Sequence, residues 1–169
     1  FEAEYYNLVG LAATQQRQFE NAEGFLKQAL NILKDQPKSR VANYVLLNLG
    51  HLYTLQNDLE LTLKYLQASL TLARERQDAR LEMVSLSNTA WYHILKNQYI
   101  DSITLSKQAL AIAERIDDQF FSLTIRGNLG YALWQQGHRL EGERIYRDHI
   151  KLLYELGSLQ SFVENAFEL

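Results

Sequence analysis

Cysteine is absent from the 169 residues, and proline occurs only once. Without cysteine the chain has no disulfide, no thiolate metal ligand and no cysteine nucleophile, and a reducing compartment, the cytoplasm, is expected. The near absence of proline favours ordered helices over a loop-rich β fold. No apolar run approaches the roughly 18 residues of a membrane span, and no signal segment opens the chain, so we expect no membrane association.

Basic and catalytic features are also scarce. The 17 Lys and Arg residues are outnumbered by 20 Asp and Glu residues, which gives a formal net charge of −3. Because phosphate binding needs a basic surface, nucleic acid is not an expected partner of this domain. The four histidines lack metal-ligand spacing, and no glycine-rich phosphate loop precedes a helix. We therefore expect no enzyme, no cofactor and no metal site.

A period of 40 residues organises the chain and aligns Gly10, Gly50, Ala90 and Gly130. A fixed period of about 20–50 residues is typical of stacked repeats, in which each unit buries its apolar face against its neighbours. The period predicts four units, over about residues 1–36, 37–76, 77–116 and 117–156, and residues 157–169 begin a fifth unit or a capping helix. Because the sequence begins and ends inside predicted helices, the natural protein is expected to be longer.

Each unit has the pattern of two amphipathic helices. In the second unit Leu46, Leu49 and Tyr53 recur at helical spacing, and leucines after Asn57 form a second stripe. Helices are predicted near residues 2–16, 19–35, 39–56, 59–76, 79–96, 99–116, 119–136 and 139–156. The turn inside each unit falls at aligned residues suited to the left-handed conformation, namely Arg17, Asn57, Asn97 and Gly137. Between units, side chains suited to capping a helix stand at Asp78, Asp118 and Ser158, with Pro37 near the corresponding place in the first unit.

The small residues of the first alignment predict where two helices of a unit meet. Opposite them we expect Ala22, Thr62, Ser102 and Gly142, because small side chains let two helix backbones approach closely. These positions are structural, and no binding role is expected of them.

These columns resemble the signature of the tetratricopeptide repeats. In the second unit the signature is carried by Leu46, Leu49, Gly50, Tyr53, Thr62, Leu66 and Ser69. The departures are Thr89, Ser106, Arg126 and His149, and the units are longer than the usual length of about 34 residues. Long units of this kind are similar to those of bacterial signalling ATPases, bacterial transcriptional activators and eukaryotic peptide-binding adaptors. The resemblance implies an all-α, right-handed solenoid of antiparallel helix pairs.

A second column is unexpected inside a helix. Asn48, Asn88 and Asn128 recur at the 40-residue spacing, although each Asn costs about 0.7 kcal/mol of helix propensity relative to Ala. The same helical face carries Tyr44, His51, Leu55, Val84, Trp91, Leu95, Thr124, Tyr131 and Gln135. The resemblance implies that this face lines a concave groove, where a row of Asn amides pairs with the backbone of an extended peptide. The alternative is that each Asn bonds to its neighbouring helix and stabilises the stack.

Two further expectations concern the partner. Trp91, Tyr131 and Trp134 fall on turns that face the groove and can form apolar pockets for a partner's side chains; the alternative is that they are buried. Chaperone-binding members of the family hold a terminal carboxylate with lysine and arginine, but Leu11, Leu47, Leu55 and Ser87 stand where such cations would be useful. A chaperone tail is therefore disfavoured.

We expect a protein- or peptide-binding scaffold, part of a larger bacterial protein, that captures an extended segment in its groove. The alternative is a regulatory domain of a bacterial transcriptional regulator or signalling ATPase that senses a ligand or a signal peptide. Self-association through the terminal repeats or the groove is compatible with both.

Overall fold

The computed structural model describes residues 1–155, and this part of the chain contains helices and turns but no strand. The helices are α1 (Glu2–Gln15), α2 (Phe19–Ile32), η1 (Leu33–Asp35), α3 (Arg40–Leu55), α4 (Leu59–Glu75), α5 (Ala79–Leu95), α6 (Tyr99–Arg115), α7 (Gln119–Gln135) and α8 (Arg139–Glu155). The predicted helices are confirmed except at one junction: residues 33–35, expected to complete the second helix, form the short 3-10 helix η1. The predicted segment 157–169 lies outside the described residues.

The turns confirm the left-handed positions expected inside the units. Positive φ angles occur at Arg17 (58°), Asn57 (60°), Asn97 (56°) and Gly137 (94°). The same conformation also closes two of the helices at the ends of units, where Gln77 and Asp117 each have a φ of 54°. Neither residue type favours this region as glycine does, so these two turns have no clear signal in the sequence.

The aligned aspartates between the units cap the helices that they precede. Oδ1 of Asp78 accepts a hydrogen bond from the Leu81 amide at 3.1 Å, and Oδ1 of Asp118 accepts one from the Phe121 amide at 3.1 Å. Each bond satisfies an N–H group that the first turn of a helix leaves free. At the first junction, where Pro37 marks the break, Ser39 caps α3 through the Ala42 amide. Ser158 lies outside the described residues.

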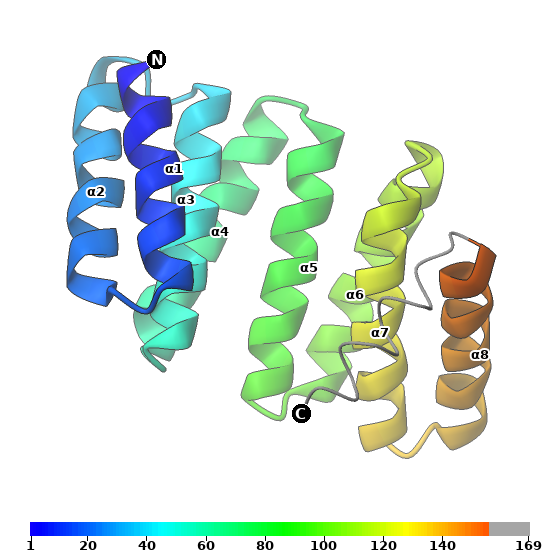
Figure 1. Cartoon of the computed structure of the whole chain (residues 1–169). Coiled ribbons are helices and arrows are strands. Elements are labelled where there is room, and N and C mark those ends of the chain that lie inside the picture. The colour runs from blue at the N-terminus through cyan, green and yellow to red at the C-terminus, as the bar shows by residue number, and fades with distance from the viewer. Residues whose placement is uncertain (156–169) are drawn as a thin grey trace.

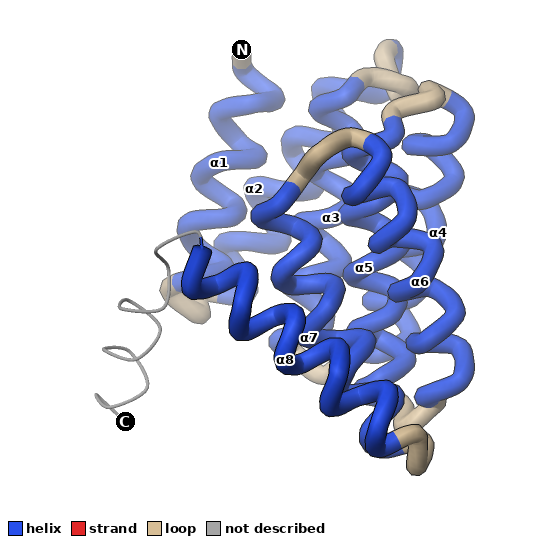
Figure 2. The backbone as a smooth tube through the Cα atoms, turned by 90° about the vertical axis from the view of Figure 1, so that its right-hand side faces the viewer, coloured by secondary structure: helices blue, strands red, loops and turns tan. Residues whose placement is uncertain are grey.

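The helices form two layers. Figure 1 shows the antiparallel pairs following one another from α1 and α2 at one end of the row to α7 and α8 at the other, and Figure 2 shows that short turns join the helices at their ends. Consecutive odd-numbered helices pack against each other, whereas consecutive even-numbered helices do not pack closely within residues 1–155. Because the inner layer of a curved stack is the more crowded one, the odd-numbered helices line the concave face. The chain is an all-α repeat solenoid.

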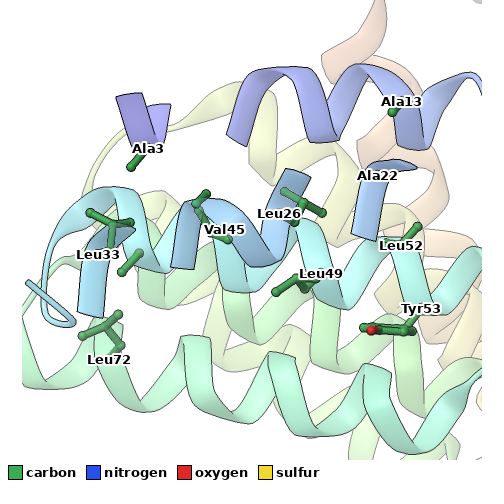
Figure 3. Close-up of a cluster of buried hydrophobic side chains, with 12 residues drawn as sticks. Ala3, Ala13, Ala22, Leu26, Leu33, Val45, Leu49, Leu52, Tyr53 and Leu72 are labelled. Carbon is green, nitrogen blue, oxygen red and sulfur yellow. The ribbon is translucent and has the colours of Figure 1, made fainter. Parts of the chain in front are cut away.

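Apolar side chains fill the space between the layers. In the first two units Leu26, Leu49 and Leu72 belong to one cluster of buried residues contributed by α1 to α4 (Figure 3). Separate clusters continue it through the third and fourth units. Each unit thus buries its apolar face partly against the next, as the 40-residue period predicts.

The small-residue column lies where the helices of a unit meet. A Cβ atom on Gly142 would lie 3.1 Å from the carbonyl oxygen of Gly130, which confirms that this pair is in close contact. In the first two units the nearest atoms to the glycine belong to the residue one turn further along the partner helix: a Cβ on Gly10 would lie 2.7 Å from Cγ of Leu26. The glycine therefore makes room for a large side chain as well as for a close backbone.

A buried chain of polar groups joins the second and third units. Nδ2 of Asn43 donates to the Ser69 carbonyl oxygen at 3.0 Å, and the Ser69 hydroxyl lies 2.7 Å from Oδ1 of Asn43 and 2.7 Å from Oγ of Ser85. We call these three residues, from α3, α4 and α5, the polar joint. All three are fully buried, so their mutual hydrogen bonds offset the loss of water. By contrast, the buried hydroxyls of Ser102 and Ser106 in α6 have no hydrogen-bond partner among the described residues.

Candidate binding groove

A hollow opens on the concave face between α3 and α5. These two helices touch only slightly, whereas α1 packs more closely against α3, and α5 against α7. The hollow has a volume of about 580 Å³ and is lined by Arg40, Tyr44, Leu47, Asn48, His51, Arg80, Leu81, Val84, Asn88 and Phe121. We call it the main hollow. It combines an apolar floor with amides and cations, a composition typical of binding sites.

A smaller hollow adjoins the main one. It measures about 160 Å³ and is lined by Gly50, His51, Thr54, Leu55, Leu66, Asn88 and Trp91. We call it the side hollow. His51 and Asn88 line both hollows, so the two form one continuous groove along α3 and α5.

The structure brings together one part of the predicted groove. The predicted residues that line the two hollows are Tyr44, Asn48, His51, Leu55, Val84, Asn88 and Trp91. Those outside both hollows are Leu95, Thr124, Asn128, Tyr131 and Gln135. They remain on the same face of the inner layer, and all of them except the half-buried Asn128 are exposed. The predicted face is thus present, and the hollow part of it belongs to the second and third units.

The aromatic side chains of this face are accessible to a partner. Trp91 is 43% exposed and lines the side hollow, whereas Tyr131 is 40% exposed and lies outside both hollows. Tyr131 meets Tyr99 of α6 edge-on, with ring centroids 6.5 Å apart. Trp134, also expected near the groove, is 45% exposed and lies beneath the guanidinium of Arg139.

The three asparagines of the predicted ladder differ in their partners. Nδ2 of Asn48 donates to Oδ1 of Asn7 on α1 at 2.8 Å, so the stabilising alternative describes this residue. The side chains of Asn88 and Asn128 make no hydrogen bond to any residue within 1–155 and are half-buried. An amide with two donors and an acceptor that stays unpaired on a concave face is available to a ligand.

His51 stands where the two hollows meet. Its ring is accessible to solvent, but the atoms around it in the groove displace part of its water, and this desolvation lowers the pKa of the imidazole. The neutral form is therefore favoured, in which one ring nitrogen donates and the other accepts a hydrogen bond.

Two cations were missed by the sequence reasoning, which described the groove as short of positive charge. Arg40 is the first residue of α3, and Arg80 is the second residue of α5; both line the main hollow. They lie eight residues before Asn48 and Asn88, one turn beyond the positions that we considered. Their recurrence at the 40-residue spacing was the signal that could have revealed them.

No other constellation in the described part of the chain suggests chemistry. Residues 1–155 hold no group of three or more His, Cys, Asp or Glu side chains arranged to bind a metal ion. None of their helices is both long and apolar enough to cross a bilayer.

The arrangement of helices can be compared with solved structures. A structure described as the nearly identical TPR-like repeats of a putative kinesin light chain from Podosopora anserina has a TM-score of 0.59 and 12% sequence identity, with 91% of this chain and 95% of that chain covered. The chain has a TPR-like repeat fold. No family model matches the sequence, and no curated protein is similar enough to match it.

Two further structures resemble this TPR-like chain more closely in shape. BtubC (BKLC) from P. vanneervenii has a TM-score of 0.83 and 15% identity over 92% of this chain. Aspartyl phosphate phosphatase F from Bacillus subtilis has a TM-score of 0.84 and 15% identity, also over 92% of this chain. The TPR-like chain spans 64% of the first and 41% of the second, less than two thirds of either. At these identities the likeness establishes the fold alone, that of a helical repeat solenoid.

Proposed function

We propose that the TPR-like chain is a non-catalytic module that captures an extended segment of a partner protein in the groove between α3 and α5. The observation that carries the proposal is the unpaired amide of Asn88, which lines both hollows. Extended segments expose backbone N–H and C=O groups, and an Asn side chain can pair with both at once.

The other two asparagines, Asn128 and Asn48, also support capture of an extended segment. Asn128 also lacks an internal partner within the described residues, and it continues the row toward α8. At the other end, the bond from Asn48 to Asn7 uses one donor of Asn48 and leaves its carbonyl oxygen free to accept a hydrogen bond. The resulting row offers donors and an acceptor at one-repeat intervals, which suits a chain laid across the inner helices.

The test is a selection of linear peptides on the purified protein, followed by titration of each selected peptide. The Asn88→Ala/Asn128→Ala variant should weaken binding by about tenfold or more, because two backbone-directed hydrogen bonds are lost. A matched control is Asn21→Ala/Asn31→Ala, which removes two exposed amides from α2 on the outer layer. Equal affinity of the wild type and the groove variant would contradict capture by the asparagines.

Tryptophan fluorescence gives an independent readout of the same site. The chain has two tryptophans, and the Trp134→Phe variant leaves only Trp91, which lines the side hollow. A peptide bound in the groove should shift or quench the emission of Trp91. An unchanged spectrum at saturating peptide would place the binding site elsewhere.

A second candidate function is a sensing domain, in which peptide binding changes the curvature of the stack. It is favoured by the slight contact between α3 and α5, which leaves these helices free to close on a ligand. Small-angle scattering with and without a selected peptide distinguishes the two. A change in the radius of gyration supports sensing, and an unchanged profile supports a static scaffold.

A further inference from the structure

The main hollow presents two cationic side chains, although the chain as a whole carries a net charge of −3. These cations are Arg40 and Arg80, since the neutral form of His51 is favoured, and the lining contains no carboxylate. The other lining residues are apolar, aromatic or amide side chains. A partner group that enters this hollow therefore meets two guanidinium groups without opposing charge on the surface that it touches.

Each of the two arginines forms an ion pair with an aspartate that does not line the main hollow. Nε of Arg40 lies 3.2 Å from Oδ2 of Asp78, and Nη2 of Arg80 lies 3.5 Å from Oδ2 of Asp118. The other oxygen of each aspartate caps the helix that follows, so the carboxylate is itself fixed. Each guanidinium is tethered through one nitrogen only.

Most of the binding capacity of these side chains remains unused. A guanidinium carries five N–H donors, and the side chains of Arg40 and Arg80 are 51% and 55% exposed. The aromatic rings of Tyr44 and Phe121 lie 5.9 Å and 5.7 Å from the guanidinium carbons of Arg40 and Arg80, which further limits their motion. A side chain that is already ordered loses less entropy when it binds a ligand.

Among the described units, only the second and third carry an arginine at this aligned position. At the aligned position of the fourth unit stands Phe120, which is 72% exposed. The arginine pair therefore brackets the space between α3 and α5, where the hollow lies. The side hollow, with Leu55, Leu66 and Trp91, adjoins the main hollow at Asn88 and is the more apolar of the two.

We propose that the captured segment carries an internal acidic side chain, Asp or Glu, that binds between Arg40 and Arg80, with an apolar side chain a few residues away in the side hollow. This inference rests on the proposed function, since it names the class of segment captured. A carboxylate accepts paired hydrogen bonds from guanidinium groups in a fixed geometry, which gives specificity as well as affinity. Asn88, between the two hollows, holds the intervening backbone.

The experiment is a selection from linear peptides with acetylated N-termini and amidated C-termini, so that every carboxylate in the library belongs to a side chain. Wild type should enrich Asp or Glu at one position, at a fixed spacing from an apolar residue. In each selected peptide, replacement of that acid by its amide should weaken binding to wild type by about tenfold and leave binding to Arg40→Gln/Arg80→Gln nearly unchanged. Raising the salt concentration should weaken binding to wild type more than to this variant.

A matched control distinguishes the loss of this arginine pair from a general loss of positive charge. Arg74→Gln/Arg126→Gln removes two arginines that also form ion pairs, with Glu82 and Glu114, but do not line the hollow. This variant should retain the preference for acidic peptides. Thermal melting of both variants shows whether either has lost its fold, and Arg40→Lys/Arg80→Lys, which keeps the charge, should recover part of the preference.

The outcomes distinguish the inference from the function on which it rests. Peptides that bind through Asn88 and Asn128 without acidic enrichment overturn the inference and leave capture intact. Tighter binding of a phosphoserine than of Asp or Glu at the enriched position, or a requirement for a free C-terminal carboxylate, also overturns it. If wild type selects no peptide at all, both the inference and the proposed function fail.

Discussion

Gly50 of α3 faces Leu66 of α4 so closely that a Cβ atom on the glycine would lie 2.9 Å from Cδ2 and 3.1 Å from Cγ of the leucine. We expect Gly50→Leu to lower the free energy of unfolding by about 1–3 kcal/mol, because the added atoms overpack this contact. Gly24→Ala is the control: it lies on an exposed face of α2 with no atom within 4 Å of the new Cβ, and it should stabilise the helix by about 0.5–1 kcal/mol. Urea denaturation measures both, and an unchanged midpoint for Gly50→Leu would rule out the close contact.

The buried serines should differ in their contribution to stability, according to whether the hydroxyl is hydrogen-bonded. Ser106→Ala removes a buried hydroxyl that has no partner within residues 1–155, so the variant should be as stable as wild type or more stable by up to about 1 kcal/mol. Ser69→Ala removes a hydroxyl bonded to Asn43 and Ser85 and should cost about 1–3 kcal/mol. Calorimetry on the two variants tests the difference, and equal melting temperatures would contradict the assignment.

The helix caps predict a reciprocal pair of changes. Asp78→Ala should destabilise the fold by about 1 kcal/mol, because the Leu81 amide loses its acceptor. Gln98 precedes α6 without a side-chain cap bond, so Gln98→Asp should stabilise the fold by about 1 kcal/mol. Hydrogen exchange of the first-turn amides of α5 and α6 locates the effect. Opposite signs are required; a stabilising Asp78→Ala would refute the capping role.

Two histidines should make the fold less stable in mild acid. Desolvation lowers the pKa of His51 and of His149 below the ordinary value of 6.5, so near that pH the unfolded chain binds more protons than the folded chain. Their contribution to stability is therefore complete above about pH 6.5 and is lost as the pH falls below that value. His51→Gln/His149→Gln should flatten the dependence of the urea midpoint on pH between about pH 7.5 and 5.5. A dependence as steep as that of wild type would contradict the desolvation of these two histidines.

Much of the fold could be predicted because its signals repeat. One weak helical stripe says little, but Gly10, Gly50 and Gly130 in one register fix the helix pairs and their order. Asn88 and Trp91 could be assigned to one helical face for the same reason, since the face follows from the helical period. Arg40 and Arg80 were missed because the reach of the hollow depends on how far α3 and α5 separate, a tertiary property that no local pattern records.

Other departures have equally specific causes. The bond between Asn48 and Asn7 joins residues 41 positions apart, one position off the repeat, so it cannot be read from an alignment column. Gln77 and Asp117 adopt positive φ angles at the turns between units, where no glycine marks the left-handed conformation. The short helix η1 replaces the last turn of α2 at the junction where Pro37 interrupts the chain.

The residues of the polar joint line neither hollow, yet they can influence how strongly a ligand is bound in the groove. Asn43, Ser69 and Ser85 are buried, line neither hollow, and tie α3 to α4 and α4 to α5 through bonds of 2.7–3.0 Å. Hydrogen bonds of this kind fix a spacing much more narrowly than apolar contacts do. A single substitution in the polar joint can therefore change how readily α3 and α5 move relative to each other, and with it the affinity for a bound segment, while every contact residue stays the same.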